Sequence, residues 1–123
     1  MIVVDETISN PRLISAIVRW YPGAVISARQ FRPNTRLLDE DIPRHLIQLN
    51  QPTFITLNYT DWNKRQLAHS AYCIVAFRLT NEEALRIPGL LREILRRPEY
   101  RTKRLRCGKV ICWSETALFH HEI

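Results

Sequence analysis

The sequence has no long run of apolar residues and nothing that marks an export signal. No stretch of about 18 consecutive apolar residues, the length that crosses a bilayer as a helix, is present. The first residues, Met1–Asp5, have the pattern of a strand and no basic segment followed by an apolar one, as a secretory signal would have. We therefore expect a cytoplasmic protein that does not enter a membrane.

Glycine is scarce, with three in 123 residues, and the sequence has neither an internal repeat nor a low-complexity segment. These absences argue against a fibrous or disordered chain. A content of 46% hydrophobic and 24% charged residues is that of a packed globular protein. At this length we expect a single domain, residues 1–123, with a hydrophobic core of its own.

Cysteine is also rare, and the three cysteines include no CxxC pair. Cys73 and Cys112 lie inside apolar runs, so we expect reduced, mostly buried thiols. A zinc site would need a ligand set whose spacing matches no common finger or ribbon, namely Cys107, Cys112, His120 and His121. The sequence therefore disfavours zinc.

Acidic residues are outnumbered, 12 against 18 Lys and Arg, and the net charge is +6 with a pI of about 9.7. This balance favours a polyanionic partner such as RNA, and an anionic membrane surface fits the charge equally well. Two stretches, 29–36 and 98–109, carry the densest positive charge. Six candidates for contact with a nucleic-acid backbone lie there: Arg29, Arg32, Arg36, Arg101, Lys103 and Arg104. A solvated charged face is the alternative for the second stretch.

Strand-like and helix-like segments alternate along the chain. Strands are predicted at 2–4, 24–28, 53–57, 72–77, 109–113 and 117–121, and helices at 11–21, 39–50 and 81–97. The continuous apolar run 72–77 is typical of a strand buried on both faces. We therefore predict an α/β fold, a three-layer α/β/α sandwich with a mostly parallel central sheet and a C-terminal β-hairpin at one edge.

Acidic residues recur next to predicted strand ends. Asp5 and Glu6 follow the first strand, Asp39 opens the helix that leads to the third strand, and Asp61 follows the third strand. Ligands of open parallel sheets bind beyond the carboxyl ends of the strands, so we expect these acids at one edge. Several carboxylates together suit Mg²⁺ or Mn²⁺, which activate water for phosphodiester hydrolysis. For Asp39, a helix cap is the structural alternative.

These segments, taken in order, resemble the PIN-like superfamily. The resemblance rests on an opening strand that ends in Asp-Glu, a helix start at Asp39-Glu40-Asp41-Ile42, and a strand followed by a turn with Asp61 and an aromatic residue. It covers nearly the whole chain. It implies a three-layer α/β/α fold and an Mg²⁺- or Mn²⁺-dependent ribonuclease, often the toxin of a toxin–antitoxin pair.

The resemblance also implies roles for individual residues. Asp5, Asp39 and Asp61 would be catalytic, and the metal ligands would be Asp5, Glu6, Asp39 and Asp61. RNA would be the substrate and an antitoxin protein a partner, while a homodimer is left open. Asn58 stands where the pattern usually has its first aspartate, and Leu57 replaces a polar neighbour.

Two other functions fit part of the sequence. A degenerate PIN-like module that binds RNA or a protein without cutting is favoured by Asn58. A response-regulator receiver has a similar length, an acid pair after its first strand and an aspartate after its third. Here Asn58 ends the third strand and no lysine follows 110–113, which disfavours the receiver.

Overall fold

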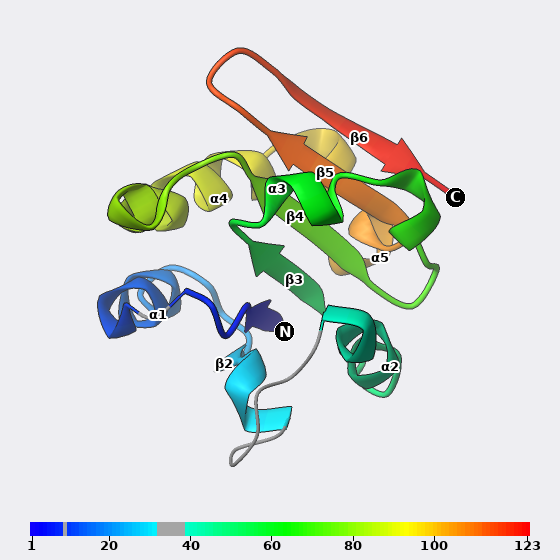
Figure 1. Cartoon of the computed structure of the whole chain (residues 1–123), viewed down its shortest axis with the longest axis horizontal. Helices are drawn as coiled ribbons and strands as arrows, with labels where there is room; N and C mark the ends of the chain where they lie inside the picture. Colours follow the sequence, from blue (N-terminus) through cyan, green and yellow to red (C-terminus); the bar gives the residue numbers. More distant parts are fainter. Residues whose placement is uncertain (9, 32–38) are drawn as a thin grey trace.

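A six-stranded sheet forms the centre of the chain in the computed structural model, which describes residues 1–8, 10–31 and 39–123 (Figure 1). The strands are β1 (Ile2–Val4), β2 (Val25–Ser27), β3 (Thr53–Thr56), β4 (Cys73–Phe77), β5 (Lys109–Trp113) and β6 (Leu118–Glu122). Their order across the sheet is β2-β1-β3-β4-β5-β6. The first five are parallel and β6 is antiparallel to β5, so the predicted α/β class with a mostly parallel sheet is confirmed.

The order of the first five strands, 2-1-3-4-5, is that of a doubly wound sheet. The chain goes from β1 outward to β2 and then returns to place β3 on the other side of β1. The strands β2 and β3 therefore lie on opposite sides of β1 in the sheet. In such sheets the crevice beyond the carboxyl ends of the two strands at this reversal, here β1 and β3, is where ligands bind.

Short helices connect the strands. They are α1 (Pro11–Val18), α2 (Ile42–Ile47), α3 (Tyr59–Trp62), α4 (Ile87–Leu95) and α5 (Lys103–Arg106). The connections also contain five short 3₁₀ helices among the described residues: η1 (Ala28–Phe31), η2 (Asp39–Asp41), η3 (Arg65–Leu67), η4 (Asn81–Arg86) and η5 (Pro98–Tyr100). No helix within the described ranges is long and apolar enough to cross a membrane.

Local sequence explains where the main helices begin. The Asn10 side chain accepts a hydrogen bond from the Arg12 N–H at 3.0 Å, and Pro11 occupies the first position of α1. The long helix predicted at 81–97 is instead divided into η4 and α4. Pro88 has no N–H to donate and is tolerated only in the first turn of a helix, so the regular α-helix begins at Ile87.

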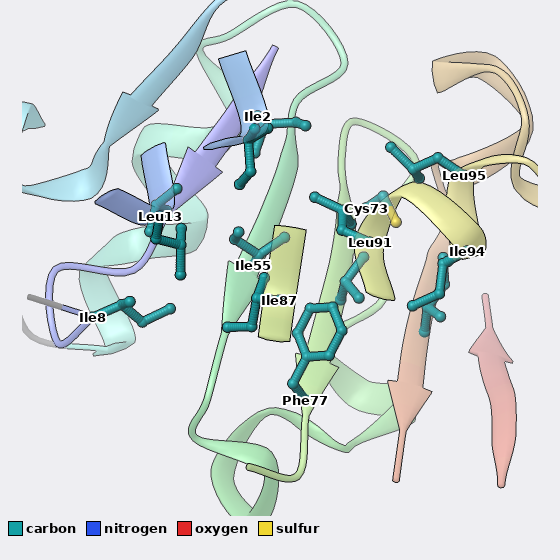
Figure 2. Packing of buried hydrophobic residues seen from close by; sticks show 14 of the residues in the cluster. Ile2, Ile8, Leu13, Ile55, Cys73, Phe77, Ile87, Leu91, Ile94 and Leu95 are labelled. Carbon is teal, nitrogen blue, oxygen red and sulfur yellow. The ribbon is translucent and has the colours of Figure 1, made fainter. Parts of the chain in front are cut away.

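Two hydrophobic cores lie on the two faces of the sheet, because alternate residues of each strand point in opposite directions. Ile2, Ile55 and Phe77 belong to the first core, which α1 and α4 cover with residues such as Leu13 and Leu91 (Figure 2). The second core contains Val3, Phe54, Ile74 and Val110 from the strands and Ile42, Leu46 and Trp62 from α2 and α3. Helices therefore pack on both faces, and α2 and α3 share one of them.

Candidate functional site at the carboxyl edge of the sheet

Asp5 follows β1 directly, and only 1% of its surface is exposed. Its N–H donates to the Ile55 carbonyl oxygen at 3.0 Å, which extends the pairing of β1 with β3 by one residue. The Thr56 hydroxyl donates to Oδ2 of Asp5 at 2.6 Å, and the Thr7 N–H donates to Oδ1 at 3.4 Å. The carboxyl group is therefore fixed where the strands β1 and β3 end.

Strand alternation explains why Asp5 and Thr56 meet. Val3 and Phe54 lie two residues earlier on β1 and β3, and both side chains belong to the second core. Residues two apart on a strand share a face, and neighbouring strands are about 4.8 Å apart, so Asp5 and Thr56 lie side by side on this face. The helices α2 and α3 cover this face of the sheet. Asp39, just before α2, and Asp61, on α3, lie on the same face as Asp5.

Asn58 connects the remaining acids to this pair. Its Nδ2 donates to Oδ2 of Asp61 at 2.8 Å and to Oδ2 of Asp39 at 3.3 Å. Its backbone N–H donates to the Thr56 hydroxyl oxygen at 3.0 Å. A continuous series of hydrogen bonds thus joins five residues, which we call the acidic cluster: Asp5, Thr56, Asn58, Asp39 and Asp61. The structure brings together the three aspartates singled out from the sequence.

The members of the acidic cluster differ in their electrostatic environment. Burial raises the pKa of Asp5 because it disfavours the charged form, hydrogen bonds from Thr56 and Thr7 oppose this rise, and the charge of Glu6 adds to it. Asp39 and Asp61 are exposed to solvent. Glu6 is partly exposed beside Asp5. The cluster therefore combines one buried carboxyl group with two exposed ones.

The donor atoms of the acidic cluster suit a hard cation in type, because carboxylate and amide oxygens are the ligands that Mg²⁺ and Mn²⁺ prefer. Among the described residues, however, no three His, Cys, Asp or Glu side chains are placed to hold a metal ion. The Asn58 amide nitrogen lies between the Asp39 and Asp61 carboxylates instead. An ion at this place requires the amide to turn so that its oxygen faces inward.

The predicted basic contacts do not all lie beside these acids. Arg29 is exposed on η1, directly after β2, and so lies at the carboxyl edge. Arg32 and Arg36 are outside the described residues. The stretch around α5 leads into the start of β5, which places it at the opposite, amino edge of the sheet.

This second group comprises Arg101, Lys103 and Arg104, all exposed. A strand rises about 3.3 Å per residue, so the length of β3 alone puts roughly 13 Å between the two edges. Burial lowers the pKa of the Met1 amino group, at the start of β1, and the positive charge of Lys103 lowers it further. These three residues therefore lie at the edge opposite to the acids, because their segment precedes a parallel strand rather than following one, and their contact with nucleic acid stays a prediction.

Two residues of this edge were missed from the sequence. Thr56 links Asp5 to Asn58, and a polar residue at the end of a buried strand was the available signal. Arg78 directly follows β4, and its guanidinium lies 5.8 Å from the centre of the Tyr59 ring. Its place after the apolar run 72–77 was the corresponding signal. Arg78 and Arg29 are thus two exposed cations at the carboxyl edge.

Three of the four residues considered for zinc, His120, His121 and Cys112, form hydrogen bonds with neighbouring segments. His120 Nδ1 lies 2.6 Å from the Tyr100 hydroxyl, and His121 Nε2 lies 2.7 Å from Asn63 Oδ1. The Cys112 thiol donates to the same Asn63 oxygen at 2.9 Å. These hydrogen bonds connect β5 and β6 to Asn63 and to Tyr100 on η5.

Comparison of this chain with protein-family models, with curated proteins and with solved structures gives no match.

Proposed function

We propose that the protein is a PIN-like, metal-dependent ribonuclease whose active site is the acidic cluster. One observation carries the proposal: hydrogen bonds join carboxyl groups from positions 5, 39 and 61 beyond the carboxyl ends of β1 and β3. Three segments distant in sequence converge there, at the reversal of a doubly wound sheet, where such folds bind ligands. A PIN-like α/β/α sandwich with a hairpin at its C-terminal edge is part of this proposal.

The residues that would hold Mg²⁺ or Mn²⁺ are Asp39, Asp61 and the side-chain oxygen of Asn58, with Asp5 and Glu6 behind them. A bound ion would neutralise the phosphate charge and activate a water for in-line attack. The Thr56 hydroxyl donates to Asp5 Oδ2 at 2.6 Å, and the Thr7 N–H donates to Oδ1 at 3.4 Å, so the carboxyl group is held in one orientation at the proposed site. Burial raises the pKa of Asp5, so without an ion this carboxyl group keeps its proton to a higher pH than an ordinary aspartate does.

The substrate side of the proposal rests on charge and aromatic surface at the same edge. Arg29 and Arg78 are exposed and suited to phosphate contacts, which position a nucleic-acid strand. Tyr59 adjoins Asn58 and has the guanidinium of Arg78 over its ring, so an aromatic side chain and a cation lie together at this edge, a combination common in sites that bind single-stranded nucleic acid. RNA with single-stranded regions is accordingly the proposed substrate.

The direct test is cleavage of a mixed RNA pool by purified protein with Mg²⁺ or Mn²⁺, with EDTA as one control. Asp39→Asn and Asp5→Asn should abolish cleavage, and circular dichroism should show that both variants are folded. Asp41→Asn is the matched control, because it removes a carboxylate from η2 that pairs with Arg44 at 3.4 Å. Cleavage that persists in EDTA, or in Asp5→Asn and Asp39→Asn, would refute the proposal.

A non-cutting module is the second candidate, and one observation favours it. The neutral Asn58 amide occupies the place between Asp39 and Asp61, and the described residues offer no three-acid group for a metal. RNA binding without cleavage at any divalent-ion concentration would support this function. Harmless expression without a co-purifying partner would count against a toxin with an antitoxin.

The fold is compatible with a response-regulator receiver, but no aspartate stands where a receiver accepts its phosphoryl group. The 2-1-3-4-5 strand order is one that response regulators share. Fold alone does not set function, and the residue two places after β3 is Asn58 rather than an aspartate. Incubation with acetyl phosphate should leave the mass of the protein unchanged, whereas a stable phosphoryl adduct would revive this alternative.

A further inference from the structure

A strongly basic cavity lies at the amino edge of the sheet, on the side away from the acidic cluster. Its volume is about 420 Å³, and five cationic residues line it: Arg92, Arg96, Arg101, Lys103 and Arg106. None of the described residues that line it is acidic. We call this cavity the basic pocket. Its lining comes from the ends of α1 and α4 and from the segment around α5.

The positive charge of the basic pocket is not neutralised within the described part of the chain. None of its five cations forms an ion pair with a described residue. Neighbouring arginines on the same segments behave differently, since Arg86 pairs with Glu83 and Glu115, and Arg97 pairs with Glu99. Several cations without ion-pair partners around one concavity produce a positive potential there, which attracts anions.

Arg106 gives the basic pocket a fixed centre. It is 3% exposed, and its Nε donates to the Thr53 hydroxyl at 3.0 Å. Its Nη1 donates to the carbonyl oxygens of Tyr100 at 3.0 Å and of Arg101 at 3.3 Å. Its Nη2 has no hydrogen-bond partner among the described residues. A guanidinium held in this way loses little freedom when it binds phosphate with its remaining N–H groups.

An aromatic wall completes the basic pocket. Trp20 and Tyr21, at the end of α1, line it and meet edge to face with ring centres 6.1 Å apart. The indole N–H of Trp20 is buried and has no acceptor among the described residues. A flat ring beside several unpaired cations is the pairing that recognises a base and a phosphate in one ligand.

We propose that the basic pocket binds a nucleoside phosphate, with the phosphate held by Arg106 and Lys103 and the base placed against Trp20. The volume lies within the roughly 300–1,000 Å³ usual for small-ligand sites. The ligand is either a free nucleotide or the phosphorylated end of an RNA strand, since both present the same chemistry. The proposal does not depend on the acidic cluster, which lies at the other end of β3.

The test is titration with ADP at low ionic strength, followed by calorimetry and by tryptophan fluorescence. Lys103→Ala should weaken ADP binding by about tenfold, the loss of one charge-assisted contact. Arg104→Ala, at an exposed position on the same helix that does not line the pocket, should weaken ADP binding far less than Lys103→Ala, because it removes only long-range attraction and no contact. Trp20→Phe should abolish the fluorescence change while calorimetry still detects ADP.

Further ligands distinguish a free nucleotide from a phosphorylated RNA end, and the phosphate contact from the base contact. A 5′-phosphorylated oligonucleotide that binds more tightly than ADP and its 5′-hydroxyl counterpart would support the pocket and identify a strand end as the ligand. Pyrophosphate that binds as tightly as ADP would refute the base contact. Equal weakening by Arg104→Ala and Lys103→Ala, or no ADP binding, would refute the site. Asp5→Asn should bind ADP like the wild type even if RNA cleavage is lost or was never present.

Discussion

The Thr56 hydroxyl donates to Oδ2 of Asp5 at 2.6 Å and joins two side chains that lie 51 positions apart in the sequence. Both residues are buried, and the same hydroxyl oxygen accepts the Asn58 N–H. A hydroxyl group both donates and accepts, so one small side chain fixes the buried acid and the backbone that carries Asn58. The geometry of the whole acidic cluster therefore depends on Thr56.

Thr56→Val should lower the free energy of unfolding by about 1–3 kcal/mol, because it leaves the Asp5 carboxyl and the Asn58 N–H without their partner. The variant should also raise the pKa of Asp5 further, since the Thr56 hydrogen bond lowers it. Urea unfolding and a carboxyl NMR titration measure the two effects. Thr60→Val, on the exposed side of α3, is the control. Equal losses in both variants would contradict the role of the hydroxyl.

Asp5 should make the free energy of unfolding decrease as the pH rises above the ordinary pKa of an aspartate. Because its pKa is raised in the folded state, the native protein keeps a proton above about pH 4 that the unfolded chain has lost. The free energy of unfolding contributed by Asp5 is thus fully present below about pH 4 and is lost as the pH rises through the folded pKa. The difference in unfolding free energy between wild type and Asp5→Asn should change over this range. A difference that is the same at every pH, as a purely steric effect would give, contradicts the prediction.

Asn58→Asp should convert the acidic cluster into a tighter metal site. A carboxylate in place of the amide supplies a third negative oxygen donor beside Asp39 and Asp61, so we expect Mn²⁺ affinity to rise at least about tenfold. Without the ion, repulsion among the acids should destabilise this variant. Calorimetry with Mn²⁺ measures the gain, and Asn81→Asp, on the exposed turn η4, controls for the added charge. Unchanged affinity would argue that no ion binds between these side chains.

The three thiols should react at different rates in the native protein. Burial raises the pKa of Cys73 to about 12 and that of Cys112 to about 11, and the thiolate is the reactive form. Cys107 is partly exposed, and burial raises its pKa as well. A disulfide reagent should therefore label Cys107 first, and Cys107→Ser should lose the first phase. Rapid labelling of three thiols without denaturant would contradict the buried positions of Cys73 and Cys112.

Leu91→Ala should test the first core. Leu91 on α4 is fully buried against the sheet, and removing its side chain should cost about 2–5 kcal/mol of unfolding free energy (Figure 2). Leu85 on η4 is 48% exposed, so Leu85→Ala is the matched control and should cost under about 1 kcal/mol. Chemical denaturation compares the two. A small loss at Leu91 would mean that α4 does not pack as described.

The sheet and the convergence of the acids could be predicted from sequence because both follow from local patterns. The buried strand β4 is a continuous apolar run, Asp5 directly follows a strand-like segment, and Asp61 comes a few residues after another. Parallel strands place such positions at one edge. The positions of the strands are therefore enough to predict that Asp5 and Asp61 lie at the same edge of the sheet.

The positions of the basic residues could not be predicted from charge alone. Lys103 and Arg106 precede β5, and a residue that precedes a parallel strand lies at the edge opposite to one that follows it. Thr56 was missed for another reason. Its role depends on a partner 51 positions away, and hydrogen bonds over such separations leave no local pattern. The division of the predicted helix into η4 and α4 has a third reason. The capping box at Thr80 and Glu83 favours a helix that starts at 81, whereas Pro88 lacks an N–H and favours a helix that starts at Ile87.

The strand β3 is four residues long, and its two threonines bind groups of opposite charge: Thr53 accepts from Arg106, and Thr56 donates to Asp5. Among the described residues, the five cations of the basic pocket thus lie toward the amino end of the central strands, and the three aspartates of the acidic cluster lie toward the carboxyl end together with Arg29 and Arg78. A diffusing polyanion should turn the protein so that its amino edge leads at first encounter. The Debye length is about 8 Å at physiological salt, so this orientation should speed association most strongly in dilute buffer.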